Sequence, residues 1–174
     1  EGDDINVEFT GTLRDYQEPV VNKFITHCET VKYGGGLLEL PCAWGKTSAA
    51  LYILSKLKKK TIVIVHKEFL MNQWIERIQQ FLPTARVGKI QGKIIDIEDK
   101  DIVIGMLQSL SMKEYPASLF DSFGLTIIDE VHHISSEVFS NALFKLVTKH
   151  MLGLSATMNR KDGTTFVFKL FLGD

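Results

Sequence analysis

The stretch 38-LELPCAWGKTSAALYIL-54 passes from a short apolar run through a proline into a Gly-Lys-Thr triplet, and then into apolar residues with helical spacing. This order predicts a strand, a loop and a helix that opens at Lys46. A phosphate-binding loop has the pattern G-x-x-x-x-G-K-[ST], whose backbone N–H groups surround the phosphates. Here Leu40 occupies the position of the first glycine. The stretch is therefore compatible with two interpretations, a phosphate-binding loop with few glycines and an ordinary helix start.

Apolar runs of strand length alternate with segments of helical period along the chain. The expected strands are β-branched or leucine-rich and are bounded by polar or turn residues: 37-LLEL-40, 61-TIVIV-65, 101-DIVIG-105, 124-GLTIID-129 and 151-MLGLSA-156. This alternation predicts βαβ units and a parallel sheet with helices on both faces. The predicted fold class is therefore α/β, a three-layer αβα sandwich with a mostly parallel sheet, in a single domain over residues 1–174.

The segment 67-KEFLMNQWIERIQQF-81 has the spacing of an amphipathic helix that ends before Pro83. The apolar positions at three- and four-residue steps are Phe69, Leu70, Trp74, Ile78 and Phe81. The pattern predicts that these residues, Trp74 among them, face the core.

Two further segments have local patterns of their own. Residues 86–101 alternate apolar and polar side chains around Gly88 and Gly92, which predicts a small hairpin at the sheet edge. The like-charge cluster Lys58, Lys59 and Lys60 follows an expected helix, where favourable interaction with the helix dipole explains it.

Composition limits the classes of protein. The chain has 174 residues, 45% of them hydrophobic, and its 20 basic and 21 acidic side chains leave a net charge of -1, so any nucleic-acid contact must be local. Cys28 and Cys42 are too few for a disulfide framework or a Cys-rich zinc site. No secretory segment and no run of roughly 18 apolar residues occurs. We expect an intracellular, non-secreted protein of unspecified compartment, without a membrane partner.

Reactive side chains follow three expected strands, and ligands of parallel sheets bind beyond the carboxyl ends of the strands. A helix opening at Lys46 would direct N–H groups at a phosphate, with the lysine adding charge and the Thr47 hydroxyl suited to magnesium. Asp129 lies where a second magnesium contact is needed. Glu130 would orient the attacking water. This division of roles predicts nucleotide hydrolysis.

Each of these features also has a purely structural explanation. An Asp-Glu pair at a strand end is commonly a helix cap with a first-turn acid, and Ser155-Ala156-Thr157 is an ordinary tripeptide. His132 and His133 point apart on a helix and have no evident third ligand, which argues against a metal site. The order and separation of the three features favour a nucleotide site over coincidence.

In this order the residues resemble the superfamily 2 helicases and translocases over nearly the whole chain. The resemblance is greatest to the XPB-like and phage UvsW-like branch, which has similar proteins in large DNA viruses. The segment 40-LPCAWGKT-47 resembles motif I, 129-DEVH-132 resembles motif II in its DExH form, and Ser155-Ala156-Thr157 resembles motif III. The resemblance implies a RecA-like P-loop NTPase lobe with ATP and Mg²⁺ as cofactors.

The resemblance also implies site residues. The catalytic set would be Lys46, Asp129, Glu130 and His132, with magnesium at Thr47 and Asp129. ATP would contact Arg14 and Gln17 of the adenine-recognition element 13-LRDYQEPVVNKF-24, and the motif I residues Pro41, Cys42, Ala43, Trp44, Gly45, Lys46, Thr47 and Ser48. Nucleic-acid contact and coupling would fall to His66, Lys67, Gln108, Ser109, Ser155, Thr157 and Arg160. The alternatives are a solvent-facing Gln17, a polar loop at His66-Lys67 and a helix cap at Gln108-Ser109.

Two positions depart from the family pattern. Ala43 stands where glycine is common, because the backbone there approaches the phosphates closely. A modest loss of nucleotide affinity is expected. Met158 replaces a proline in 153-GLSATMNRKDG-163, which makes that turn less rigid.

Motifs IV to VI, which belong to a second RecA-like lobe, do not occur in the sequence. We therefore expect a monomeric piece of a longer protein that binds nucleotide weakly and hydrolyses it slowly or undetectably by itself. The full-length protein would be an ATP-dependent DNA helicase or translocase, whose partners are nucleic acid, with DNA favoured over RNA, and its own second lobe. The alternatives are a duplex-translocating remodeller, an RNA helicase of the same superfamily and a catalytically silent binding scaffold.

Overall fold

The computed structural model describes residues 3–10, 22, 25, 34–39, 46–112, 117–130 and 150–155. Helices and strands alternate along these residues, as the sequence predicts, apart from three consecutive strands between Val87 and Met106. They are β1 (Gly34–Glu39), α2 (Lys46–Leu57), β2 (Thr61–Val65), α3 (Glu68–Phe81), β3 (Val87–Gln91), β4 (Ile94–Ile95), β5 (Ile102–Met106), α4 (Leu107–Met112), the 3-10 helix η2 (Ala117–Phe120), β6 (Leu125–Ile128) and β7 (His150–Ser155).

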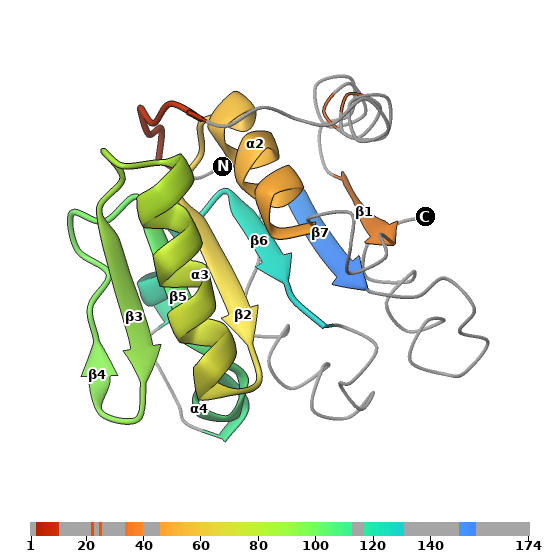
Figure 1. Cartoon of the computed structure of the whole chain (residues 1–174). Helices are drawn as coiled ribbons and strands as arrows, with labels where there is room; N and C mark the ends of the chain where they lie inside the picture. Colours follow the sequence, from red (N-terminus) through yellow and green to blue (C-terminus); the bar gives the residue numbers. More distant parts are fainter. Residues whose placement is uncertain are drawn as a thin grey trace.

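Within the described residues, seven strands form one sheet in the order β1-β7-β6-β2-β5-β3-β4. Neighbouring strands are parallel except for β3 and β4, which form an antiparallel hairpin at one edge. The arrows of β1, β7, β6 and β2 point the same way in Figure 1, so their carboxyl ends lie along one side of the sheet. The predicted mostly parallel sheet and the predicted edge hairpin are both confirmed.

Apolar side chains cover both faces of the sheet. Val63 and Val65 of β2 belong to one core cluster together with residues of α2 and α3. Ile62 and Ile64 belong to a second cluster with residues of α4 and η2. A strand buried on both faces has a continuous apolar sequence instead of an alternating one, which explains the run TIVIV. The three-layer αβα sandwich is therefore confirmed.

Helix α3 occupies the segment that its apolar spacing predicts. Its buried residues are Leu70, Met71, Trp74 and Ile78. The expectation for Phe69 is wrong, because its side chain is 59% exposed. Phe69 precedes Leu70 by one residue, and one residue rotates the side chain by about 100° around a helix of 3.6 residues per turn. Met71 takes the buried place instead.

The β3–β4 hairpin depends on a close approach of two backbones at Gly88. A Cβ atom added there would lie 1.9 Å from the Asp96 carbonyl oxygen, which belongs to the returning strand segment. The Asp96 N–H donates to the Lys89 carbonyl oxygen at 2.9 Å, so this segment is held in place by the hairpin itself. Only glycine fits at position 88 without a backbone shift.

Gly88→Ala is expected to lower the free energy of unfolding by about 1–3 kcal/mol, the usual cost of forcing an extra group into a packed place. Urea unfolding of the chain measures this. Gly92→Asn is the matched control, because Gly92 has φ +60° with nothing within 4 Å of an added Cβ, and asparagine tolerates that conformation. Equal stability of the two variants would contradict the account.

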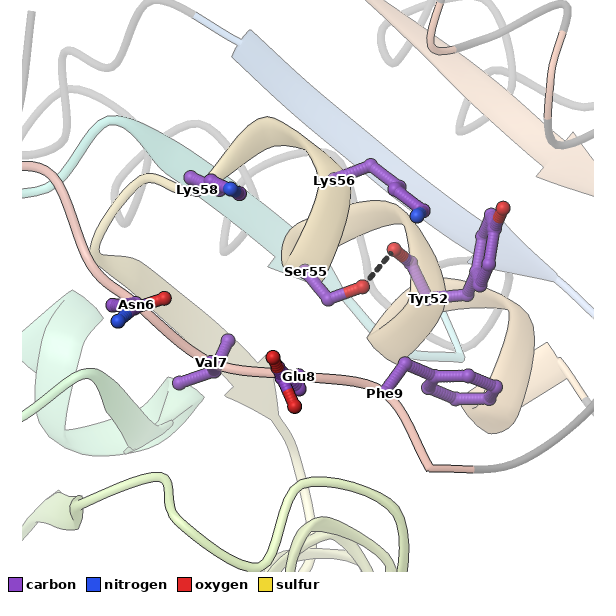
Figure 2. Close-up of a pocket in the computed structure, with 8 residues that line it drawn as sticks. All are labelled: Asn6, Val7, Glu8, Phe9, Tyr52, Ser55, Lys56 and Lys58. Atoms are coloured by element: carbon purple, nitrogen blue, oxygen red, sulfur yellow. Dashed lines mark hydrogen bonds between the residues drawn. The ribbon is translucent and has the colours of Figure 1, made fainter.

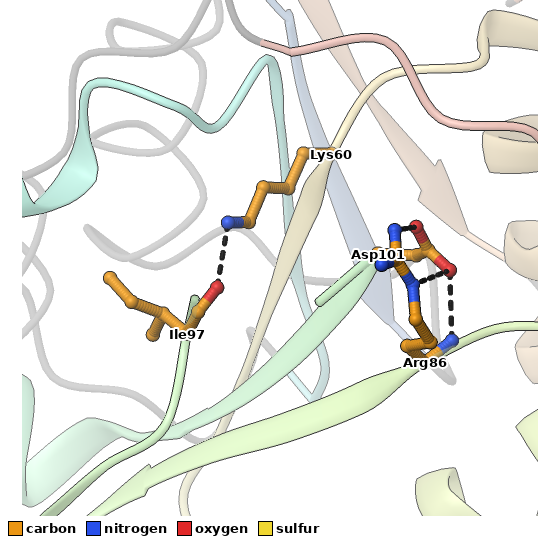
Figure 3. A network of polar contacts seen from close by, with 4 residues as sticks. All are labelled: Lys60, Arg86, Ile97 and Asp101. Carbon is orange, nitrogen blue, oxygen red and sulfur yellow. Dashed lines mark hydrogen bonds and ion pairs between the residues drawn. The ribbon is translucent and has the colours of Figure 1, made fainter. Parts of the chain in front are cut away.

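Polar contacts hold together the residues that lie just before strands β2, β3 and β5 (Figure 3). Arg86, just before β3, donates from its backbone N at 2.8 Å and from Nη2 at 3.0 Å to the carboxylate of Asp101, just before β5. This carboxylate, by hydrogen bond and charge, raises the pKa of the Arg86 guanidinium above its ordinary value. Lys60, just before β2, is buried and its Nζ donates to the Ile97 carbonyl oxygen at 2.7 Å. The explanation of Lys60 by the helix dipole is therefore wrong, since this lysine holds the hairpin segment to the sheet.

Candidate nucleotide and nucleic-acid site

The expected site residues among the described residues gather at the carboxyl ends of the parallel strands. Helix α2 begins at Lys46, shortly after β1, and Asp129 and Glu130 follow β6 directly. Strands β1 and β6 both pair with β7, which ends at Ser155 between them. Neighbouring strands lie about 4.8 Å apart, so the ends of β1 and β6 are separated by about 10 Å. The start of α2 and the acidic pair therefore border the same space.

Asp129 is held at two points and is only 2% exposed. Its backbone N–H donates to the Ile64 carbonyl oxygen of β2 at 3.0 Å, directly after the last paired residue of β6, Ile128. Its carboxylate oxygen Oδ2 accepts a hydrogen bond from the indole Nε1 of Trp74 at 2.8 Å. Trp74 is a core residue, as predicted, but it also contacts the expected magnesium ligand. The sequence offered one signal for this, because a buried indole N–H usually has an acceptor.

Glu130 adopts an uncommon backbone conformation. Its φ of 53° lies in the left-handed region, which residues with a Cβ rarely occupy, and its side chain is half-buried. Such conformations cost of order 1–3 kcal/mol and cluster at functional sites. The position coincides with the acid that the sequence assigns to water activation.

The first turn of α2 suits an anion. Thr47 and Ser48 are half-buried there, and Ala49 and Ala50 are fully buried, so small side chains let the helix lie close to the sheet. The turn contains no acidic residue, so no carboxylate of its own offsets the positive end of the helix dipole. Helix α3, in contrast, carries Glu68 in its first turn.

The segments after β2 and β5 are joined by a hydrogen bond. Gln108 Nε2, at the start of α4, donates to the His66 carbonyl oxygen at 3.0 Å, and both Gln108 and Lys67 are exposed. The expectation for Ser109 does not fit its position, because this residue is 8% exposed and its Oγ accepts a hydrogen bond from the Gly92 N–H at 3.0 Å. Ser109 instead holds the turn of the β3–β4 hairpin to α4.

Several expected site residues lie outside the described residues. They are Arg14, Gln17, Pro41, Cys42, Ala43, Trp44, Gly45, His132, Thr157 and Arg160. Lys46 and Ser155 are placed by their backbones, at the first position of α2 and the last position of β7.

The pocket in Figure 2 lies away from this site, between the amino-terminal segment and the last turns of α2. It is lined by Asn6, Val7, Glu8, Phe9, Tyr52, Ser55, Lys56 and Lys58. Lys56 is ten residues beyond Lys46 in α2, which corresponds to about 15 Å along a helix axis. This pocket is therefore separate from the carboxyl ends of the strands.

No helix in the described part of the chain is long and apolar enough to cross a membrane.

The chain is similar to several known proteins. The family described as "Type III restriction enzyme, res subunit" matches residues 10–160. "Putative ATP-dependent RNA helicase L396" of Acanthamoeba polyphaga mimivirus is 40% identical over 168 residues, which cover 97% of this chain and 32% of that protein. QP509L of African swine fever virus (isolate Pig/Kenya/KEN-50/1950), whose name carries the same description, is 33% identical over 96% of this chain and 33% of that protein. The chain thus spans about a third of the length of these curated relatives.

Solved structures share the fold at low identity. The Sulfolobus solfataricus SWI2/SNF2 ATPase core in complex with dsDNA superposes with a TM-score of 0.76 at 21% identity, covering 98% of this chain and 37% of that chain. The UvsW helicase of bacteriophage T4 superposes with a TM-score of 0.68 at 20% identity, covering 94% and 60%. The chain therefore shares its fold with these ATPase and helicase cores, and it belongs to the family described as type III restriction enzyme, res subunit.

Proposed function

We propose that this chain is the ATP-binding motor lobe of an ATP-dependent DNA helicase or translocase, in which ATP hydrolysis drives movement on nucleic acid. The observation that carries the proposal is the placement of the α2 start and the Asp129-Glu130 pair at the same side of the sheet, two strands apart. The first provides N–H groups for phosphates and the second provides acidic groups for a metal and a water.

The donor groups fit ATP with Mg²⁺. Lys46 would contact the outer phosphates, and the Thr47 hydroxyl and the Asp129 carboxylate are the oxygen donors that Mg²⁺ prefers. Magnesium, when bound, would neutralise charge on the phosphates. Glu130 would accept a hydrogen bond from the attacking water and orient it, while the start of α2 stabilises negative charge on the phosphate oxygens. We also assign His132 to the catalytic residues, because it belongs to the segment 129-DEVH-132 that resembles motif II.

Nucleic acid would lie across the segments after β2 and β5. His66, Lys67 and Gln108 are placed there, and contacts to phosphate and sugar would position a strand without reading its sequence. Ser155, Thr157 and Arg160 would couple these nucleic-acid contacts to the state of the bound nucleotide. The resemblance of the motifs favours DNA, whereas the names of the viral relatives favour RNA as a second candidate. ATPase stimulation of the full-length protein by single-stranded and duplex DNA and RNA, measured in parallel, decides between them.

Lys46→Ala is expected to weaken ATP binding to the full-length protein by about 10- to 100-fold, because a charged hydrogen bond is worth about 1.5–3 kcal/mol. Binding of labelled ATP with magnesium measures this. Lys56→Ala is the matched control, since Lys56 lies in the last turn of the same helix and is exposed. Equal ATP binding by wild type and Lys46→Ala would contradict the proposal, and no binding by wild type would favour the silent scaffold.

A further inference from the structure

The indole of Trp74 and the carboxylate of Asp129 form a buried polar pair between two layers of the fold. Trp74 lies in α3 and Asp129 follows β6, and the side chains are 1% and 2% exposed. The distance from Trp74 Nε1 to Asp129 Oδ2 is 2.8 Å. An indole N–H only donates and an ionised carboxylate only accepts, so this bond has a fixed direction.

The bond is well placed to fix the orientation of the carboxylate. The Asp129 backbone is already tied to β2 by the bond from its N–H to Ile64, so one remaining freedom is rotation of the side chain. The indole cannot follow such a rotation, because Trp74 belongs to the core cluster that also contains Leu70 and Ile78 of α3. Interior side chains in such clusters are close-packed and stay near one rotamer.

A hydrogen bond to a charged, buried acceptor is among the strong ones, and little water reaches this place to replace it. Loss of the N–H would leave the carboxylate of Asp129 without this donor and less well oriented. Carboxylates that bind metals are commonly oriented by hydrogen bonds of this kind, and removing the orienting group typically lowers metal affinity or activity by about 10- to 100-fold.

We infer that Trp74 is a positioning residue for Asp129, whose indole N–H holds the carboxylate in the orientation that receives the magnesium of the nucleotide. This inference rests on the proposed function, because it assigns the magnesium contact to Asp129. It gives the buried face of α3 a role in the site in addition to its role in the core.

The sharpest test removes the N–H and keeps the shape. In the full-length protein, Trp74 is replaced by β-(3-benzothienyl)alanine, in which sulfur takes the place of the indole N–H. The Mg²⁺ concentration that gives half-maximal binding of a fluorescent ADP analogue is expected to rise by about 10- to 100-fold. Binding of the same analogue without Mg²⁺ is expected to stay unchanged. An unchanged Mg²⁺ requirement would overturn the inference.

Two further measurements separate positioning from core packing. Ile78→Val, on the same buried face of α3, removes a methylene group from the core, and its Mg²⁺ requirement is expected to stay at the wild-type value. A rise equal to that of the Trp74 analogue would overturn the inference.

The hydrogen bond itself can be observed by NMR with ¹⁵N-labelled indoles. The Trp74 Nε1–H resonance is assigned by its loss in Trp74→Phe, and this resonance is expected to shift in Asp129→Asn. No shift would show that the bond is not formed in solution.

Asp129→Asn separates failure of the inference from failure of the proposed function. If this variant has the wild-type Mg²⁺ requirement, Asp129 is not the magnesium contact, and both proposals fail. If the requirement rises in Asp129→Asn but not in the Trp74 analogue, the proposed function stands and only the role of Trp74 is overturned.

Discussion

Glu130→Gln is expected to leave ATP binding of the full-length protein intact and to lower ATP turnover by about 100-fold or more, the usual contribution of a positioned acid or base. Glutamine keeps the size and branching of the side chain, so the left-handed backbone at φ 53° costs the same in both proteins. What is lost is the negative charge that accepts a proton or hydrogen bond from the attacking water. Single-turnover hydrolysis at saturating nucleic acid, together with ATP binding, measures the effect.

Glu76→Gln is the matched control for this variant. Glu76 is exposed on α3 and lies outside the groups assigned to nucleotide or nucleic acid, so its replacement is expected to leave turnover unchanged. Unimpaired hydrolysis in Glu130→Gln would remove Glu130 from its assigned role. Loss of ATP binding together with turnover would show instead that Glu130 holds the nucleotide or the fold of the site.

The sheet was predictable because its central strands are buried on both faces. Only β-branched and aliphatic side chains fit such a place, and the run 61-TIVIV-65 shows them without interruption. The start of β1 was not predictable in this way. Gly34–Gly36 carry no side-chain pattern, and they are strand because they pair with β7 from His150 to Leu152. The strand conformation of Gly34–Gly36 depends on pairing with β7, and a local sequence pattern carries no information about that pairing.

Side-chain burial was harder to predict than secondary structure. Lys60 stands in a run of three lysines, and charge runs are usually solvated, yet its Nζ reaches the Ile97 carbonyl oxygen and lies 5.2 Å from the centroid of the Phe123 ring. Both partners are brought there by chain segments far along the sequence. The burial of Ile5 and Val7 in the amino-terminal segment was not predicted either, although their two-residue spacing is typical of a segment with one buried face.

The location of the site could be predicted, but its internal contacts could not. Residues that follow parallel strands meet at one side of the sheet whatever the details of the loops, so Asp129 and the start of α2 were assigned to one site from their order alone. The bond between Trp74 and Asp129 joins residues 55 positions apart on two different elements. The sequence shows that a buried indole requires an acceptor, but it does not show which acceptor the packing of α3 will bring to it.

The isolated chain of residues 1–174 is expected to hydrolyse ATP at least about 1,000-fold more slowly than the full-length protein at saturating nucleic acid. The reason is that an arginine supplied to the transferring phosphate from outside the nucleotide-binding lobe contributes about 10³–10⁵ in rate to phosphoryl transfer. The relatives are about three times as long as this chain, which leaves room for such a lobe. ATPase assays of both proteins, with and without nucleic acid, measure the difference.

The same comparison of the isolated chain with the full-length protein tests which lobe is needed for ATP binding and which for ATP hydrolysis. The start of α2, Thr47 and Asp129 belong to this chain, so it is expected to bind ATP without the second lobe, although weakly. Lys46→Ala is the control that shows such binding to be specific. Nucleic acid is expected not to stimulate the isolated chain, because stimulation requires a second lobe that closes on the nucleotide. Full ATPase activity of the isolated chain would show that every group needed for hydrolysis lies within residues 1–174, and the role of a second lobe would then be confined to movement on nucleic acid.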